Sequence, residues 1–145
     1  MAQPDPPASL ADVPTLQAAL GEVLAPWVRE LDLQVIEAGF GVIVLALPVA
    51  PKHVHGGGVL CGQTMMAACD TAMVLAVMTR LGGFKPMTTV QLQTSFMRPV
   101  PGDSGSVRVR ARVLKMGRSL VFGEMQVTAA GGELAAHATT TYAWL

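Results

Sequence analysis

Charged residues are scarce in this sequence: Asp, Glu, Lys and Arg make up 14% of its 145 residues, whereas 51% are hydrophobic. So few charges leave little to cover an exposed surface, and we therefore expect interfaces between subunits. The ten acidic and ten basic side chains cancel, which argues against a nucleic-acid-binding protein with a strongly basic surface. The length is that of one ordinary domain.

Several patterns of common enzymes are also missing. The sequence has no G-x-S-x-G segment, no phosphate-binding glycine-lysine loop and no dinucleotide-binding glycine fingerprint, so serine-hydrolase and nucleotide chemistry are not expected. The two cysteines, Cys61 and Cys69, lie in one segment expected to be helical, where their spacing does not favour a disulfide. A cytoplasmic location is the simpler prediction.

The N-terminal residues 1–12 are acidic and proline-rich, unlike a signal or transit peptide, and we expect a flexible tail before a single domain over residues 13–145. One stretch, residues 59–78, is long enough to suggest a membrane span. It contains Asp70 near its middle, where a carboxylate would be costly in a bilayer, and it has no basic flank. We therefore expect no membrane association.

Hydrophobic periodicity predicts an α+β domain. A helix over residues 63–81 is apolar on every side and ends at two glycines, so a sheet is expected to wrap around it. In the strand that follows, Val90, Leu92 and Phe96 are expected to share the buried face. The other predicted elements are an amphipathic helix over residues 13–27, a hairpin of strands 31–37 and 42–49, and an antiparallel meander of strands 88–97, 106–115, 119–128 and 133–144.

Asp70 is the most informative single residue. Its helical neighbours one turn away are Met66, Ala67, Met73 and Val74, so its carboxylate is expected in apolar surroundings, where a charge is costly without a partner. Enzymes use such surroundings to tune a general base or a nucleophile. A buried aspartate that is satisfied by backbone donors stays the alternative.

Gly62 precedes Asp70 by just over two helical turns, where a loop becomes the predicted helix. Free backbone N–H groups and the positive end of the helix dipole gather at such a point, so it can hold a carbonyl oxygen or an oxyanion. Glycine also simply eases a tight turn into a helix, and that alternative stays open.

Three segments together resemble the hotdog-fold thioesterases of the phenylacetate-degradation type, over about residues 31–145. The segment Cys61-Gly62-Gln63 corresponds to the family's His-Gly-Gly turn, Asp70 to its helix acid and His55 to its preceding polar residue. The later segments that match are residues 88–92 with 96–99, and residues 113–120. The resemblance implies a hotdog fold, in which an antiparallel sheet wraps one long helix, and an acyl-CoA thioesterase.

By this resemblance, Asp70 would activate water or attack the thioester, and the Gly62 N–H would bind the developing oxyanion. Thr89 would hold the water, and His55 would contact the thioester and could protonate the leaving sulfur. Such sites lie across a dimer interface, so the protein is expected to be a homodimer or homotetramer. No metal or organic cofactor is expected beyond the coenzyme A of the substrate. The expected substrate-binding residues are Gln63, Met66, Met73, Arg98, Lys115, Gly117 and Arg118.

Several alternatives stay open at this point. His53 and His55 with a cysteine could bind zinc, but no second close Cys or His pair completes that site, and a loop role is favoured for His53. His137 is expected to be a satisfied sheet residue. A basic stripe could attract coenzyme A phosphates or be a solvated face; it comprises Arg108, Arg110, Arg112, Lys115 and Arg118. A hotdog hydratase or dehydratase using His55 and Asp70, and a non-catalytic acyl-CoA binder, are the rival functions.

Overall fold

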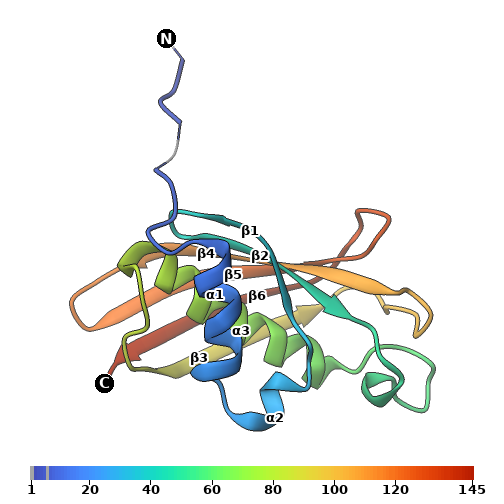
Figure 1. The fold of residues 1–145 in the computed structure, drawn as a ribbon. Coiled ribbons are helices and arrows are strands. Elements are labelled where there is room, and N and C mark those ends of the chain that lie inside the picture. Colours follow the sequence, from blue (N-terminus) through green and yellow to red (C-terminus); the bar gives the residue numbers. More distant parts are fainter. Residues whose placement is uncertain (1, 6) are drawn as a thin grey trace.

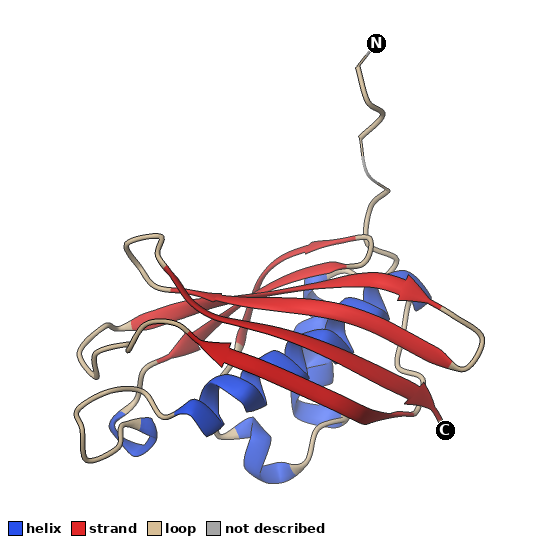
Figure 2. Ribbon diagram, turned by 180° about the vertical axis from the view of Figure 1, so that it is seen from behind, coloured by secondary structure: helices blue, strands red, loops and turns tan. Residues whose placement is uncertain are grey.

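A long helix, α3 (Gly62–Leu81), packs against one face of a six-stranded antiparallel sheet in the computed structural model, which describes residues 2–5 and 7–145. The helices lie on the same face of the sheet in both views (Figure 1 and Figure 2). This arrangement confirms the α+β hotdog architecture. The strands are β1 (Gln34–Gly39), β2 (Val42–Pro48), β3 (Met87–Phe96), β4 (Ser106–Met116), β5 (Leu120–Thr128) and β6 (Leu134–Trp144).

The central helix is the core of the domain. Twelve of the twenty residues of α3 are buried, because the sheet curves around a helix that is apolar on all sides. The helix ends where Gly82 adopts a left-handed φ of +83° and its N–H donates to the Met78 carbonyl at 2.8 Å. Its length and composition would suit a membrane span, but 67% of its most apolar window is buried inside the domain, as in the core helix of a hotdog fold.

The order of the strands differs from the predicted meander. The sheet runs β1-β2-β4-β5-β6-β3, so β3 pairs with β6 and β4 is inserted between β2 and β5. The segment after β3, which contains Pro99 and Pro101, does not turn back into a hairpin with β4. It docks instead on the loop before α3, where the Leu60 N–H donates to the Val100 carbonyl at 2.8 Å and Val59 pairs with Pro101.

The predicted helix over residues 13–27 is interrupted. The structure has α1 (Val13–Glu22) and a short α2 (Pro26–Arg29), with Ala25 extended at φ −56° and ψ 143° between them. Pro26 explains the break, because a proline disfavours helical geometry in the residue before it. Trp27 is consequently 62% exposed instead of continuing the buried stripe of α1.

A β-bulge in β3 corrects the predicted buried face of this strand. The register with β6 shifts between Thr89 and Gln91, so Val90 is the extra residue and is 60% exposed. A bulge reverses which alternate side chains face the core. Thr89 before the bulge and Leu92 after it therefore both point toward α3, although the period-two pattern places them on opposite faces.

The segment before α1 is attached to the domain. The Phe40 N–H donates to the Pro7 carbonyl at 3.2 Å, the Leu10 N–H donates to the Thr79 carbonyl at 2.7 Å, and Ala11 is buried. The flexible tail predicted for residues 1–12 includes residues 1 and 6, which lie outside the described residues. Its flexibility stays a prediction.

Candidate active site

The partly buried carboxylate of Asp70 is held by two hydroxyl groups. Its Oδ1 accepts hydrogen bonds from the Tyr142 hydroxyl at 2.6 Å and from the Thr89 Oγ1 at 2.9 Å. The Tyr142 hydroxyl also donates to the Asp70 backbone carbonyl. Within residues 2–5 and 7–145, no backbone N–H donates to the side-chain carboxylate. Asp70 is therefore not an aspartate satisfied by backbone donors, which was the alternative left open by the sequence.

The sheet brings these partners together from distant parts of the chain. Thr89 of β3 lies directly opposite Tyr142 of β6 in the strand register, and both side chains reach α3. The bulge at Val90 comes immediately after this pair, and bulges are common beside active sites because they redirect a side chain. Tyr142 was missed in the sequence analysis; the one available signal is that it is the only tyrosine in the chain.

The surroundings of Asp70 also determine the ionisation of its neighbours. Burial raises the pKa of the Tyr142 phenol above its ordinary range, and the Asp70 charge raises it further, so this hydroxyl stays a donor. Burial, and then the same charge, raise the pKa of the Cys69 thiol to about 12. Cys69 is therefore protonated at neutral pH, which makes it a poor nucleophile there.

A second group of predicted residues meets at the beginning of α3. His55, Gly62 and Arg98 line one cavity of about 320 Å³, together with the Phe96 ring. Gly62 opens the helix, and its N–H has no backbone acceptor among the described residues. A methyl group at Gly62 would lie 3.2 Å from the Phe96 ring, so the absence of a side chain leaves room at this end of the helix.

The imidazole of His55 is oriented by its own loop. Its Nδ1 accepts a hydrogen bond from the Gly57 N–H at 2.8 Å, which leaves the proton of the neutral ring on Nε2. An added Cβ at Gly57 would lie 2.7 Å from the ring, so a larger residue there would require the imidazole to move. His55 is exposed, so its Nε2 can donate to a ligand.

His53 has a more specific environment than the predicted loop role. Its Nδ1 lies 3.2 Å from the Thr64 Oγ1, which in turn lies 3.0 Å from the Cys61 Sγ. In the part of the chain that the structure describes, no three His, Cys, Asp or Glu side chains are placed to hold a metal ion. His137 is satisfied on the sheet, with its Nε2 3.4 Å from the Glu124 Oε2.

The expected substrate-binding residues fall in different places in one chain. Gln63 is exposed in the first turn of α3 and Met66 is partly buried, but Met73 is fully buried against Gly123 of β5. The turn between β4 and β5 carries Gly117 and Arg118, and Lys115 lies just before it at the end of β4. This turn and Arg98 lie at opposite ends of the sheet. They are separated by the length of the ten-residue strand β3, or about 30 Å. One chain therefore does not bring them all together.

The basic stripe lies on the outer face of β4. Arg108, Arg110 and Arg112 are exposed and alternate with buried side chains. Arg112 donates to the Glu124 carboxylate at 2.6 Å, and this hydrogen bond is the main reason that the pKa of Glu124 is lowered. At least one member of the stripe is thus paired within the sheet.

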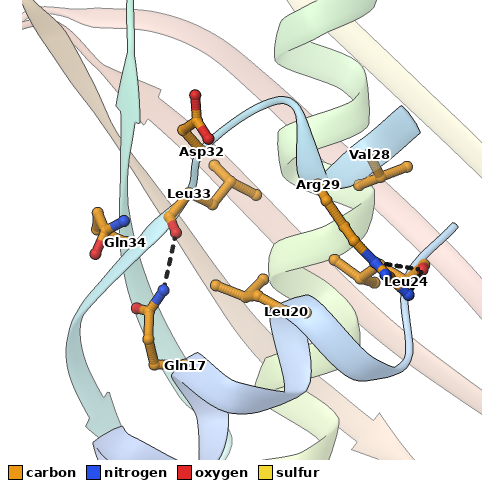
Figure 3. A pocket seen from close by; sticks show the side chains of 9 residues that line it. Gln17, Leu20, Leu24, Val28, Arg29, Asp32, Leu33 and Gln34 are labelled. Carbon is orange, nitrogen blue, oxygen red and sulfur yellow. Dashed lines mark hydrogen bonds between the residues drawn. The ribbon is translucent and has the colours of Figure 1, made fainter. Parts of the chain in front are cut away.

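A further cavity of about 240 Å³ lies between α1, α2 and β1 (Figure 3). Leu20, Leu24 and Leu33 contribute its apolar lining. The Gln17 Nε2 donates to the Leu33 carbonyl at 3.2 Å, and the Arg29 guanidinium donates to the Leu24 carbonyl. The cavity contains none of the predicted site residues.

Comparisons with known proteins agree with this fold. The model of the thioesterase superfamily matches residues 52–136, which include the α3 N-terminus, Asp70, Thr89 and the β4–β5 turn. A protein of Saccharolobus solfataricus with the provisional name of esterase is 30% identical over 108 residues, 74% of this chain and 75% of its own length.

Solved structures extend the comparison. A conserved protein of Pseudomonas aeruginosa is 30% identical with a TM-score of 0.77, covering 84% of this chain and 95% of its own. A variant of the phenylacetic acid degradation protein PaaI of Thermus thermophilus is 27% identical with a TM-score of 0.70, covering 83% and 100%. A thioesterase of Haemophilus influenzae, 22% identical, shares the fold with a TM-score of 0.81 over 92% and 90%. The chain belongs to the thioesterase superfamily.

Proposed function

We propose that this protein is an acyl-CoA thioesterase that hydrolyses a thioester to a free acid and coenzyme A. The observation that carries the proposal is the Asp70 carboxylate, partly buried in the wrapped helix and held by the hydroxyls of Thr89 and Tyr142. A carboxylate so placed can take a proton from water or attack a carbonyl carbon itself. Membership of the thioesterase superfamily directs this chemistry to a thioester.

The reaction would divide among four groups. Asp70 takes a proton from water as the water oxygen attacks the carbonyl carbon, and the Gly62 N–H stabilises the oxyanion. The Thr89 hydroxyl donates to Asp70, so its oxygen remains free to accept a hydrogen bond from the water. The carbon–sulfur bond then breaks, and the Nε2 proton of His55 is available for the leaving thiolate.

The spacing of these groups along α3 supports a site built from two chains. Gly62 and Asp70 are eight residues apart on one helix, which separates them by about 12 Å along its axis, too far to act on one carbonyl group. The free edge of β3 provides a place for a second copy, since exposed strand edges pair readily. We propose a homodimer, or a homotetramer built from it, with Gly62 and His55 from one subunit and Asp70 and Thr89 from the other.

The same assembly would bring the substrate-binding residues to one ligand. Arg98 lies with Gly62 at one end of the sheet, and Lys115, Gly117 and Arg118 lie at the other. In an antiparallel pair of subunits, opposite ends of the two sheets come together. Gln63 and Met66 would border the acyl group with Met73 behind them, and the basic turn would bind coenzyme A phosphates. We also propose a cytoplasmic location and no nucleic-acid or membrane partner.

A panel of acyl-CoA esters with aryl, short, medium and long acyl groups tests the proposal. Release of free thiol from any of them, measured with a thiol reagent, supports a thioesterase. Hydration of a 2-enoyl-CoA without thiol release would identify a hydratase instead. Tight acyl-CoA binding by calorimetry with neither reaction would identify a non-catalytic binder.

A further inference from the structure

The buried phenol of Tyr142 makes a contact that the packing of the core does not require. Its side chain is 1% exposed on β6, and a buried phenol needs a hydrogen-bond acceptor. The Asp70 backbone carbonyl alone would satisfy it. The hydroxyl is nevertheless placed within 2.6 Å of the Asp70 Oδ1 as well, so it is shared between the backbone and the side chain of the same residue.

Both hydroxyl donors bind the same oxygen of the carboxylate. Tyr142 and Thr89 donate to Oδ1 at 2.6 Å and 2.9 Å, whereas no donor within the described residues reaches Oδ2. An oxygen that accepts two hydrogen bonds has its lone pairs occupied and is the weaker base of the two. The oxygens of Asp70 are therefore chemically unequal, and Oδ2 is the one available to a ligand.

Tyr142 is the more rigid of the two donors. It is buried on β6, which is paired on both sides by β3 and β5, whereas Thr89 is exposed on the edge strand β3. A donor fixed by an interior strand can hold the carboxylate in one orientation before substrate arrives, which lowers the cost of reaching the reactive geometry.

We infer that Tyr142 is a positioning residue that fixes the Asp70 carboxylate through Oδ1 and so presents Oδ2 as the oxygen that reacts. The inference rests on the proposed thioesterase function, and it adds to that function the residue and the atom on which Asp70 depends. Burial keeps the Tyr142 phenol protonated, since its pKa is raised, and the donor is therefore present at every pH at which the enzyme would work.

The variant Tyr142→Phe removes the donor and keeps the ring. Thr140→Val is a matched control, because Thr140 is also buried on β6 and its hydroxyl donates to the Gln91 carbonyl at 2.8 Å, away from Asp70. We expect Tyr142→Phe to lower kcat by about tenfold to a hundredfold with little change in KM. This is the effect expected from the loss of one hydrogen bond to a charged group. A group that only supported the fold would not separate kcat from KM in this way. Thr140→Val should keep the wild-type kcat and KM.

Two outcomes separate this inference from the function on which it rests. An active wild type with an unchanged kcat and KM in Tyr142→Phe would overturn the positioning role and leave the thioesterase intact. A wild type that releases no thiol from any acyl-CoA would overturn both.

A measurement without turnover covers the case in which Tyr142→Phe does not fold. Because the chain has one tyrosine, labelling tyrosine with ¹³C at Cζ yields a single resonance that reports on this hydroxyl. We expect this resonance to shift in Asp70→Asn, which removes the charge of the acceptor, but to stay in place in Thr140→Val. A resonance that does not change in Asp70→Asn would refute the inference.

Discussion

Met73 of α3 and Gly123 of β5 occupy a gap between helix and sheet that has room for one side chain only. Met73 is fully buried, and a Cβ on Gly123 would overlap its Sδ and Cε atoms and lie 3.0 Å from the Arg112 carbonyl oxygen. We therefore expect Gly123→Ala to lower the free energy of unfolding by about 1–3 kcal/mol, the usual effect of overpacking a core. Urea denaturation measures it.

The strand glycine Gly39 supplies the control for this change. No atom lies within 4 Å of a Cβ built on it, so Gly39→Ala should have little effect on stability. If the clash with Met73 is the cause, Met73→Ala and Gly123→Ala together should cost less than the sum of the two single changes. Strict additivity would contradict this interpretation.

Asp70→Asn should reduce thioesterase turnover by about a hundredfold or more, because the amide is nearly isosteric but cannot act as a base or nucleophile. The amide oxygen can still accept from Thr89 and Tyr142, so the free energy of unfolding should stay close to that of the wild type. Steady-state thiol release and urea denaturation measure the two effects. Asp103→Asn, a change at an exposed loop aspartate, should leave both unchanged. Wild-type turnover in Asp70→Asn would end the proposed mechanism.

Thr89→Ala should lower kcat by about tenfold and change KM less. The substitution removes a hydrogen bond to the carboxylate and a contact for the attacking water. Thr88→Ala is the matched control, since Thr88 is the exposed neighbour of Thr89 on the same strand. Initial-rate kinetics over a range of substrate concentrations separate the two constants. An unchanged kcat with a raised KM would assign Thr89 to binding alone.

The Cys69 thiol should make the fold less stable in alkali. Its pKa is raised by burial from 9.0 to about 12, so between these values an unfolded chain loses the proton while the folded chain keeps it. The folded state then binds more protons, and the free energy of unfolding falls as the pH rises, by about 1.4 kcal/mol per pH unit for one such group.

Urea denaturation at several pH values from neutral to 11 measures this slope. In Cys69→Ala the free energy of unfolding should fall less steeply above pH 9, because the proton of this thiol no longer contributes to the slope. This holds whatever the substitution costs at neutral pH. A smaller alkaline loss should remain in that variant, because the pKa of Tyr142 is raised in the same direction. Identical slopes in the two proteins would contradict the assignment to Cys69.

Complementation tests the shared site. Asp70→Asn and His55→Ala each damage the contribution of one subunit to the site. In a dimer with one subunit of each variant, both defects fall in one of the two sites and the other site is intact. A mixture of the two inactive variants should therefore regain activity in a fraction of its dimers. Sedimentation should show at least a dimer, and exchange of labelled subunits should accompany the recovery. An active monomer, or no recovery although subunits exchange, would mean that the site lies within one chain.

The sequence by itself determined most of the local structure. The helix of α3 and its end at Gly82 follow from continuous apolar composition and a glycine that tolerates positive φ, and the strands follow from period-two alternation. These are properties of neighbouring residues, so they are visible without knowledge of the fold. Asp70 could be singled out as a candidate for the same reason, since its apolar neighbours lie one helical turn away.

The tertiary structure alone decided what surrounds Asp70. Tyr142 lies 72 residues further along the chain, and it meets the carboxylate because β3 pairs with β6 instead of β4. The bulge at Val90 then turns Thr89 to the helix, against the alternation of its strand. Strand order and bulges depend on pairing between distant segments, which the periodicity of one strand does not encode, and the two hydroxyl partners of Asp70 are a consequence of that pairing.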